Sequence, residues 1–338
     1  MTTTRVVYIG GPARSGSTLL ALLLDRLPGF VAVGESIQIW ERGLVENELC
    51  GCGTPFRDCP FWTDVGRRAF GGWDTLDAEQ MVALKESVNR IRHWPLLHGV
   101  SGRRFRRRVD AYADAMGRLY SSASAAAGGA VVVDSSKTIT GALLLARIRS
   151  VEPRIVQLVR DSRAASFSWS RSVVRPEVTR RVAHMPRYGP AQASVDWLAY
   201  TIPYHLSLRG SKRRLLVRYE SLVADPRREL ERLLAYARDE SESRALELAA
   251  RDVDLPVNHT ISGNPIRLRS GRIALRVDDE WRTAMRKRDR AVVLLLTWPL
   301  ELAYGYVGVS IAPIATAPSA ARTDEGRSAS ARRRPARR

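Results

Sequence analysis

A glycine-rich segment near the start of the chain has the residue types of a phosphate-binding loop. It runs Gly11-Pro-Ala-Arg14-Ser-Gly16-Ser17-Thr18 and matches the nucleotide-binding pattern GxxxxGK(S/T), except that Ser17 replaces the lysine. The glycines let backbone N–H groups turn inward, and a helix beginning near Ser17 adds its positive end and two hydroxyls. The segment predicts an anion site with an arginine in place of the lysine that binds ATP. The alternative is a tight strand-to-helix turn without a ligand.

A second candidate phosphate site follows a predicted strand at 154–159. Arg160 comes directly after this strand, at the edge where α/β sheets bind ligands, and Ser168 follows one or two helical turns later. A guanidinium binds phosphate bidentately, and a serine hydroxyl adds a short donor. The run Arg160-Asp161-Arg163 could instead be a surface ion-pair cluster, but the glycine-rich loop upstream favours phosphate binding.

Glu35 and Lys137 are candidates for proton transfer and charge stabilisation. Glu35 follows the first predicted helix, and Lys137 ends the segment Asp134-Ser-Ser-Lys137 that closes a predicted strand. A base must accept a hydroxyl proton, and a cation must stabilise charge on the moving group. Glu35 could instead cap the helix that starts after Ser36. A strand that ends in Asp134 is also typical of the Walker B motif, which keeps an ATP-dependent reaction open.

Three cysteines lie close together in the sequence, at Cys50, Cys52 and Cys59. The spacing C-x-C-x6-C could supply three thiolate ligands to zinc, but no fourth ligand stands at a typical spacing. We therefore favour small buried residues in a tight turn and predict no metal. An odd, clustered cysteine count is no disulfide framework, and the N-terminus lacks the apolar run of a signal peptide. Both observations favour a reducing, cytoplasmic location.

The composition is that of a globular protein with a strongly basic surface. The chain has 338 residues, of which 45% are hydrophobic and 26% charged, and its net charge is +19. A chain of this size can bury a core without disulfides or metals. The charge predicts an anionic partner, such as nucleic acid, a membrane surface or a phosphorylated small ligand. The run Arg103–Arg108 is either a solvated face or an attractor for an anionic acceptor.

Strands and helices alternate along the chain, which is typical of a parallel sheet covered on both faces. Strands are predicted at 5–10, 130–134, 154–159 and 213–218, and helices at 17–27, 138–149, 162–172, 192–208 and 225–237. Helical composition at 77–92 and 106–124 predicts an inserted helical region over about 40–125, between the first and second of these strands.

The C-terminal part of the chain contains one long apolar segment and one basic segment. Residues 291–313 are long enough to span a bilayer, but Glu301 and two prolines interrupt them, which favours a buried helix followed by apolar coil. Residues 316–338 are rich in Ala, Ser, Arg and Pro, and we predict a disordered basic tail that could associate with anionic surfaces. We expect one folded domain over 1–315.

The two phosphate motifs together resemble those of sulfotransferases that use PAPS (3′-phosphoadenosine 5′-phosphosulfate). The segment Pro12–Leu20 is similar to the loop that holds the 5′-phosphosulfate in tyrosylprotein and carbohydrate sulfotransferases, and Leu158–Arg171 resembles the family's 3′-phosphate motif. Cytosolic small-molecule members carry lysine where this chain has Arg14. The resemblance spans residues 6 to about 285. It implies an α/β fold with a P-loop-like core, a parallel sheet flanked by helices, and a helical insertion after the first βα unit.

The resemblance also implies which residues bind the donor. Arg160 and Ser168 would hold the 3′-phosphate, with Arg171 as an additional contact, and Tyr219 would lie near the nucleotide unless it is a core tyrosine. A late loop at 259–267 would close over the nucleotide. The implied donor-binding set is Arg14, Ser15, Gly16, Ser17, Thr18, Leu19, Arg160, Ser168, Arg171, Tyr219, Gly263 and Arg267.

The implied reaction moves a sulfonate from PAPS to a hydroxyl and requires no metal. Glu35 would be the general base, Arg14 and Lys137 would stabilise charge, and Ser262 would assist. The histidines at His93, His98, His184 and His259 lack the sequence context of the base in cytosolic members. The acceptor, a small molecule, glycan or peptide, would offer a sugar, lipid-linked sugar, phenol or tyrosine hydroxyl, with its pocket formed by 40–125.

Two other functions stay open at this point. An ATP-dependent small-molecule kinase could use the same anion site, although the absence of the loop lysine counts against it. The positive charge favours a nucleic-acid-binding protein, but no recognition motif accompanies it, and we predict no specific nucleic-acid partner.

Overall fold

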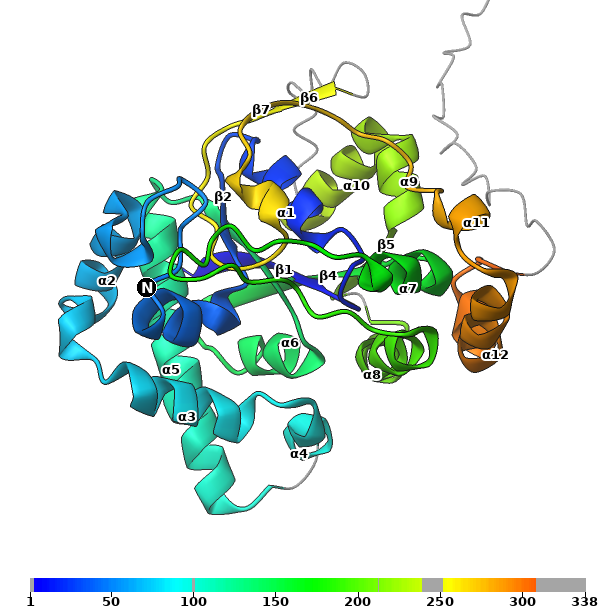
Figure 1. Cartoon of the computed structure of the whole chain (residues 1–338). Coiled ribbons are helices and arrows are strands. Elements are labelled where there is room, and N and C mark those ends of the chain that lie inside the picture. The colour runs from blue at the N-terminus through cyan, green and yellow to red at the C-terminus, as the bar shows by residue number, and fades with distance from the viewer. Residues whose placement is uncertain (1–2, 99–100, 212, 239–251, 308–338) are drawn as a thin grey trace, which may run out of the picture.

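A computed structural model describes residues 3–98, 101–211, 213–238 and 252–307. At its centre lies a parallel sheet with the strand order β2-β3-β1-β4-β5 (Figure 1). The strands are β1 (Thr4–Gly10), β2 (Phe30–Gly34), β3 (Val131–Lys137), β4 (Val151–Val159) and β5 (Arg214–Arg218). The predicted α/β fold with a parallel sheet is confirmed.

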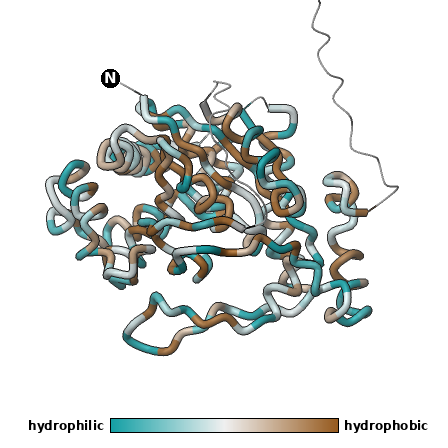
Figure 2. The backbone as a smooth tube through the Cα atoms, turned by 90° about the horizontal axis from the view of Figure 1, so that it is seen from above, coloured by the Kyte–Doolittle hydropathy of each residue, from teal (hydrophilic) through white to brown (hydrophobic). Residues whose placement is uncertain are grey.

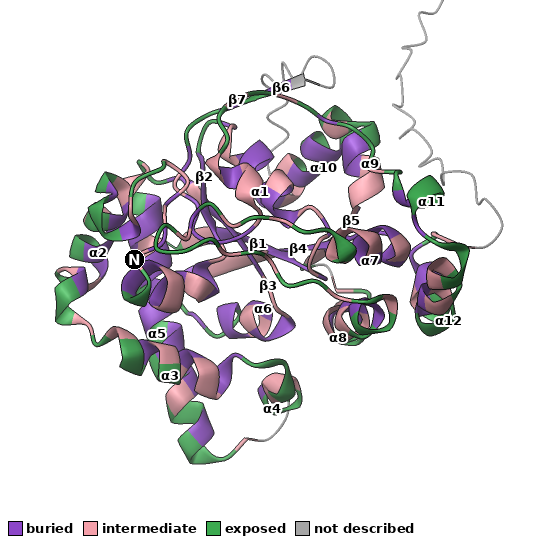
Figure 3. Ribbon diagram, in the orientation of Figure 1, coloured by how far each residue is buried: buried purple, intermediate pink, exposed green. Residues whose placement is uncertain are grey.

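Helices cover both faces of this sheet (Figure 1). On one face lie α1 (Ser17–Asp25), α9 (Tyr219–Ala224) and α10 (Pro226–Arg238), and on the other α5 (Arg103–Ala126), α6 (Ile139–Leu145) and α8 (Pro190–Leu208). Beyond the β5 side lie α7 (Ser162–Ser170), α11 (Trp281–Ala284) and α12 (Lys287–Ala303). Figure 3 shows the buried sheet enclosed by helices whose outer faces are exposed.

The central strand β1 explains why these strands appear in the sequence as continuous apolar runs. Val6 and Tyr8 belong to the core on the α5 face, whereas Val7 and Ile9 belong to the core on the α1 face. Successive side chains of a strand point to opposite faces, so a sheet covered on both sides needs apolar residues at every position. Figure 2 shows hydrophobic segments gathered in the middle of the molecule, whereas the outer segments are a mixture of hydrophilic and hydrophobic stretches.

The edge strand β2 was missed by the sequence analysis. It consists of Phe30–Gly34, is buried throughout and pairs with β3 directly after the turn at Pro28-Gly29. The inserted helical region therefore follows β2 and not α1. It contains η1 (Ser36–Gln38), η2 (Ile39–Val45), η3 (Phe56–Asp58), α2 (Pro60–Phe70), η4 (Trp73–Thr75), α3 (Ala78–Val88), η5 (Ile91–His93) and α4 (Trp94–His98) and leads into α5.

The C-terminal helix α12 packs against α7 and α8. The Glu301 side chain is fully buried and accepts a hydrogen bond of 2.8 Å from the Ser162 backbone N–H. The charged residue that interrupts the apolar segment therefore binds the start of α7 inside the protein. Within the described residues, no helix is both long and apolar enough to cross a membrane. The predicted basic tail at 316–338 lies outside the described residues.

A small antiparallel sheet holds the late loop next to β2. Its strands are β6 (Asp252–Leu255) and β7 (Gly271–Ala274), and η6 (Pro265–Leu268) lies between them. Within this connection, Ile261 pairs with β2, because its N–H donates to the Val33 carbonyl at 3.0 Å and its carbonyl accepts from the Glu35 N–H at 2.8 Å. The sheet thus brings residues from 256–270 to the carboxyl end of β2.

Candidate active site

The carboxyl ends of β1, β3 and β4 face a cavity of about 470 Å³. The late loop and the segment after β2 complete its walls. Most of the sequence-predicted site residues line it: Arg14, Gly16, Ser17, Thr18, Leu19, Glu35, Lys137, Arg160, Ser168, Tyr219 and Gly263. Parts of the chain that are far apart in the sequence therefore meet at the edge of the sheet where α/β proteins bind ligands.

The glycine-rich loop has the backbone conformation that an anion cradle requires. Gly11, Arg14 and Gly16 all have positive φ angles, of 127°, 66° and 89°. At Gly16, a Cβ atom would lie 2.5 Å from the Tyr219 ring, so only glycine fits. The helix α1 begins at Ser17 without a side-chain cap, which leaves its first N–H groups available to an anion.

Arg14 joins this loop to α7. Its Nε donates to the Ser168 hydroxyl at 3.0 Å, one terminal nitrogen donates to the Ser168 carbonyl at 3.2 Å, and the guanidinium lies 5.5 Å from the Trp169 ring centroid. Burial and the neighbouring Arg160 lower the pKa of Arg14. The two residues predicted to bind opposite ends of the donor, Arg14 and Ser168, are thus in direct contact.

Arg160 is held in place from three sides. It donates to the Arg14 carbonyl at 3.0 Å and to the Asp278 carboxylate at 2.7 Å, and it stacks on Tyr219 with 4.5 Å to the ring centroid. The residue is 5% exposed, and its Nε is a buried donor without a partner among the described residues. Leaving a buried N–H group of a guanidinium without a hydrogen bond is costly. The position of Arg160 therefore suits the binding of an anion that can accept a hydrogen bond.

Glu35 and Lys137 also line the cavity and contact each other. Glu35 directly follows β2 and Lys137 is the last residue of the neighbouring strand β3. The Lys137 ammonium donates to the Glu35 carboxylate in a salt bridge whose side chains are each 14% exposed. The Ser262 hydroxyl donates to the other carboxylate oxygen at 3.3 Å, and Arg42 donates to that hydroxyl at 2.8 Å. The late loop therefore contributes directly to this pair.

The carboxylate of Glu35 is ionised in this arrangement. Burial alone would raise its pKa, but the charge and hydrogen bond of Lys137, aided by Arg42 and Ser262, hold the pKa below its ordinary value. Its side chain makes no capping hydrogen bond to the following helix, which was the alternative role in the sequence analysis. The carboxylate can accept a proton.

Asp134 has a structural role and does not line the cavity. It is fully buried, and its two oxygens accept hydrogen bonds from the hydroxyls of Ser36, Tyr120 and Ser136, each at 2.5 Å, and from the Ser136 N–H at 2.7 Å. Burial raises the pKa of this carboxyl. The Walker B-like interpretation requires Asp134 at the cavity, so the structure does not support it.

The late loop contacts the glycine-rich loop. The Asn264 N–H donates to the Thr18 hydroxyl at 3.1 Å, and Gly263 lines the cavity between them. Ser262 is buried behind the cavity wall, where it contacts Glu35 rather than a ligand position.

Three predicted donor contacts do not lie on the cavity. Arg267 is fully buried and donates to the carbonyls of Thr260 and Leu49 at 2.9 and 2.8 Å, so it fixes the late loop from behind. Arg171 forms a surface ion pair with Glu280. The Ser15 hydroxyl donates to the Pro12 carbonyl at 2.6 Å, inside the loop. The Arg267 and Ser15 side chains therefore hold the loops around the site in place, and the Arg171 side chain lies outside the cavity.

The cavity also contains residues that the sequence analysis did not select. They include Gln38, Arg42, Trp169, Met185, Tyr200 and Asp278. Trp169 lies within the Leu158–Arg171 motif and Gln38 and Arg42 lie close to Glu35 in the sequence, which were the available signals. The positions of Met185, Tyr200 and Asp278 depend on how distant segments pack, and no motif marks them.

His259 does not face the cavity, so it is not a substitute base in this arrangement. Its Nδ1 lies 3.3 Å from the Cys59 sulfur and 3.8 Å from the Cys50 sulfur. The sequence shows no fourth candidate ligand at a typical spacing from the cysteines, but the fold brings His259 to them from a distant loop. The predicted tight turn does exist, since the Cys50 N–H donates to the Thr54 carbonyl at 2.8 Å.

Comparison with known proteins identifies the family. The family model described as "Sulfotransferase family" matches residues 7–240, and the chain belongs to the sulfotransferases. No curated protein sequence matches the chain.

Solved sulfotransferase structures resemble this one. The sulfotransferase domain of the curacin biosynthetic pathway is 16% identical, covers 89% of this chain and 99% of its own, and superposes with a TM-score of 0.50. For the sulfotransferase domain of the olefin synthase of Synechococcus PCC 7002, the identity is 21%, the coverage 91% and 97%, and the TM-score 0.47. A sulfotransferase of Mycobacterium avium is 15% identical, with coverage of 71% and 65% and a TM-score of 0.41. The curacin domain supports the same fold.

Proposed function

We propose that this sulfotransferase transfers a sulfonate from PAPS to a hydroxyl group. The observation that carries the proposal is the Glu35–Lys137 pair, which lies in the same cavity as the uncapped N-terminus of α1 and the buried Arg160. Such a cavity provides a base, a cation and two separate anion sites, which are the requirements of sulfonate transfer from a donor with two phosphate positions.

The residues around the cavity fit such a donor. The glycine-rich loop and the first turn of α1 would hold the 5′-phosphosulfate through backbone N–H groups. Arg160, with an unpaired buried Nε, and Ser168 would hold the 3′-phosphate. Arg14 belongs to the glycine-rich loop and contacts both Ser168 and Arg160, so it connects the two proposed donor-binding regions.

The chain's own groups account for each proton and charge in the proposed reaction. Glu35 accepts the hydroxyl proton, the acceptor oxygen forms a bond to sulfur, and the bond between sulfur and the 5′-phosphate oxygen breaks. Lys137 and Arg14 stabilise the charge on the moving sulfonate and on the leaving phosphate. The products are the sulfated acceptor and PAP (adenosine 3′,5′-bisphosphate). Ser262 holds Glu35 in position.

The apolar part of the cavity lining suggests the chemistry of the acceptor. Ile37, Trp169, Met185, Pro186 and Tyr200 line the cavity, and Trp169 and Met185 both contact Arg14. Aromatic and apolar side chains favour a flat or apolar group beside the reacting hydroxyl. Of the acceptors that the sequence left open, a phenol or a tyrosine side chain fits this lining better than a sugar.

A cytoplasmic site of action and association of the 316–338 tail with anionic surfaces are further proposals that follow from the sequence.

A thermal-shift comparison of PAP, ATP and NAD tests the donor directly. A ligand that binds only the folded state raises its melting temperature with concentration, so PAP should stabilise the protein selectively. Formation of PAP from PAPS in the presence of a panel of phenols and sugars then tests the reaction. Stabilisation by ATP instead of PAP would favour the kinase alternative and overturn the proposal.

A further inference from the structure

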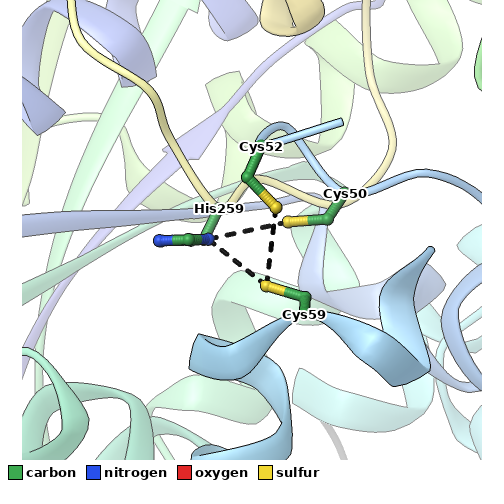
Figure 4. Close-up of side chains that lie close together, drawn as sticks. All are labelled: Cys50, Cys52, Cys59 and His259. Carbon is green, nitrogen blue, oxygen red and sulfur yellow. Dashed lines mark hydrogen bonds between the residues drawn. The ribbon is translucent and has the colours of Figure 1, made fainter. Parts of the chain in front are cut away.

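A second group of reactive side chains lies apart from the cavity (Figure 4). Cys50 and Cys52 come from the turn between η2 and η3, Cys59 precedes the first residue of α2, and His259 comes from the connection between β6 and β7. Their ligand atoms all lie within 4.8 Å of one another. The three cysteines are free, and Cys50 and Cys59 are fully buried.

The distances match the edges of a zinc tetrahedron. Zn–S bonds of about 2.3 Å and Zn–N bonds of about 2.0 Å place the ligand atoms about 3.8 Å apart for two sulfurs and about 3.6 Å apart for sulfur and nitrogen. The Cys52 and Cys59 sulfurs are 3.7 Å apart, and His259 Nδ1 lies 3.8 Å from the Cys50 sulfur and 3.3 Å from that of Cys59. Figure 4 shows the four side chains pointing toward a common centre.

We propose that Cys50, Cys52, Cys59 and His259 bind a structural zinc ion. Three thiolates and one imidazole complete a tetrahedron, which leaves no open position for a substrate and excludes a catalytic role of the usual kind. Cys59 lies at the N-terminus of α2, where the helix dipole favours a thiolate. This inference goes beyond sulfonate transfer and does not depend on it.

The surrounding contacts hold the two ligand-bearing loops together. The Gly51 N–H donates to the Thr260 carbonyl at 3.0 Å, and the Trp62 indole donates to the His259 carbonyl at 2.8 Å. The His259 ring also stacks on Phe61, with 5.0 Å between the ring centroids. The imidazole is therefore oriented by its neighbours, as is usual for a metal ligand.

The ion would fasten the late loop to the rest of the protein close to the active site. His259 lies three residues before Ser262, whose hydroxyl contacts Glu35, and Ile261 between them pairs with β2. Metal binding adds its free energy to the folded state, so the loop that positions Glu35 would be ordered by the ion. Loss of the ion should lower stability first and activity only through the position of this loop.

The metal content of the full chain, purified without a polyhistidine tag after growth with zinc, is the first test. Elemental analysis should find zinc in a stoichiometric amount. After exchange for cobalt, thiolate-to-cobalt charge-transfer bands and the visible bands of tetrahedral cobalt should appear. A strong chelator should lower the melting temperature of the zinc protein. The cobalt spectrum is recorded on the unmutated chain, so it remains decisive even where a ligand variant fails to fold.

Substitutions identify the ligands. Cys52→Ser and His259→Gln should each lose most of the zinc and alter the cobalt spectrum, whereas the matched variant His98→Gln, on the exposed end of α4, should retain both. A zinc-free protein with three titratable thiols and a chelator-insensitive melting temperature would overturn the proposal. So would a Cys52–Cys59 disulfide found by mass spectrometry, or iron in place of zinc.

Discussion

Lys137 and Glu35 form a salt bridge at the ends of two neighbouring strands, inside the cavity that would hold the donor. The pair keeps Glu35 ionised while no substrate is present, because the ammonium stabilises the carboxylate. In the proposed reaction, a sulfonate placed beside Lys137 would compete with Glu35 for the same ammonium. If Lys137 turned to the sulfonate, Glu35 would lose its partner and become a stronger base. The arrangement would thus couple donor binding to activation of the base.

Glu35→Gln should abolish most turnover while leaving the affinity for PAP, which has no sulfonate, nearly unchanged. Glutamine keeps the size and polarity of the side chain but cannot accept the hydroxyl proton. General-base catalysis is usually worth about 10²- to 10⁴-fold in rate, and we expect a loss of turnover in that range. The affinity for PAP, measured by calorimetry, should change little because a base acts only in the transition state.

Glu41→Gln is the matched control for this variant. Glu41 also forms a salt bridge with a lysine, Lys85, but it lies outside the cavity. Its turnover should stay near that of the unmodified protein. Near-normal turnover of Glu35→Gln would remove Glu35 from the mechanism.

The same pair predicts how stability depends on pH. The folded-state pKa of Glu35 is lowered, so its ionised form stabilises the fold above the unfolded-state value of about 4.3, and this contribution disappears as the pH falls through the folded-state pKa. The unmodified protein should therefore melt at a higher temperature than Glu35→Gln at neutral pH, and the difference should shrink below about pH 4. Melting curves across this pH range measure it.

Glu231→Gln provides the reference for that experiment. Glu231 pairs with Arg227 on the exposed surface of α10, where an ion pair contributes little. Its melting curve should follow that of the unmodified protein at every pH. A constant difference between the unmodified protein and Glu35→Gln down to the acid limit would contradict the lowered pKa.

The buried strands beside the cavity could be predicted from the sequence because a sheet covered on both faces requires continuous apolar runs. The run at 154–159 is long and lies within β4, Val151–Val159. The strand Phe30–Gly34 escaped notice because it is short and directly follows the stop signal of α1. Its place at the sheet edge depends on pairing with β3, which is a long-range contact that no local pattern encodes.

The residues of the candidate site fall into the same two groups, those that a local motif marks and those that only long-range packing brings to the site. Arg14, Arg160 and Lys137 could be predicted because each belongs to a local motif at or shortly after the end of a strand. Arg42 and His259 reach their partners only through the packing of distant segments. The basic residue Arg267 looked like a ligand contact in the sequence, yet its guanidinium is used to bind backbone carbonyls inside the protein. Residue type and loop position alone cannot separate these two uses.

PAP should bind much more tightly than AMP if Arg160 and Ser168 hold the 3′-phosphate. A hydrogen bond to a charged group contributes about 1.5–3 kcal/mol, which corresponds to roughly ten- to a hundredfold in affinity. Arg160→Ala should remove most of this preference in calorimetry. Arg171→Ala should preserve it, because Arg171 pairs with Glu280 outside the cavity. Equal affinities of the unmodified protein for PAP and AMP would rule out the 3′-phosphate site.

Gly16→Ala should weaken PAP binding through the shape of the loop alone. Gly16 has a φ of 89°, where a residue with a Cβ atom loses about 1–2 kcal/mol. The new methyl group would also lie 2.5 Å from the Tyr219 ring, so the loop or the ring must move. Because the N–H groups at the start of α1 would then leave their positions, we expect the affinity for PAP to fall about tenfold or more.

Gly128→Ala separates the effect of backbone strain from that of the clash with the Tyr219 ring. Gly128 has a φ of 72°, but a Cβ atom there would meet nothing within 4 Å, and the residue follows α5 and does not line the cavity. Both variants should therefore lower the melting temperature through backbone strain, whereas only Gly16→Ala should also weaken PAP binding. If Gly16→Ala binds PAP as well as Gly128→Ala does, the close packing of the loop on Tyr219 is irrelevant to the donor, and the 5′-phosphosulfate must be held elsewhere.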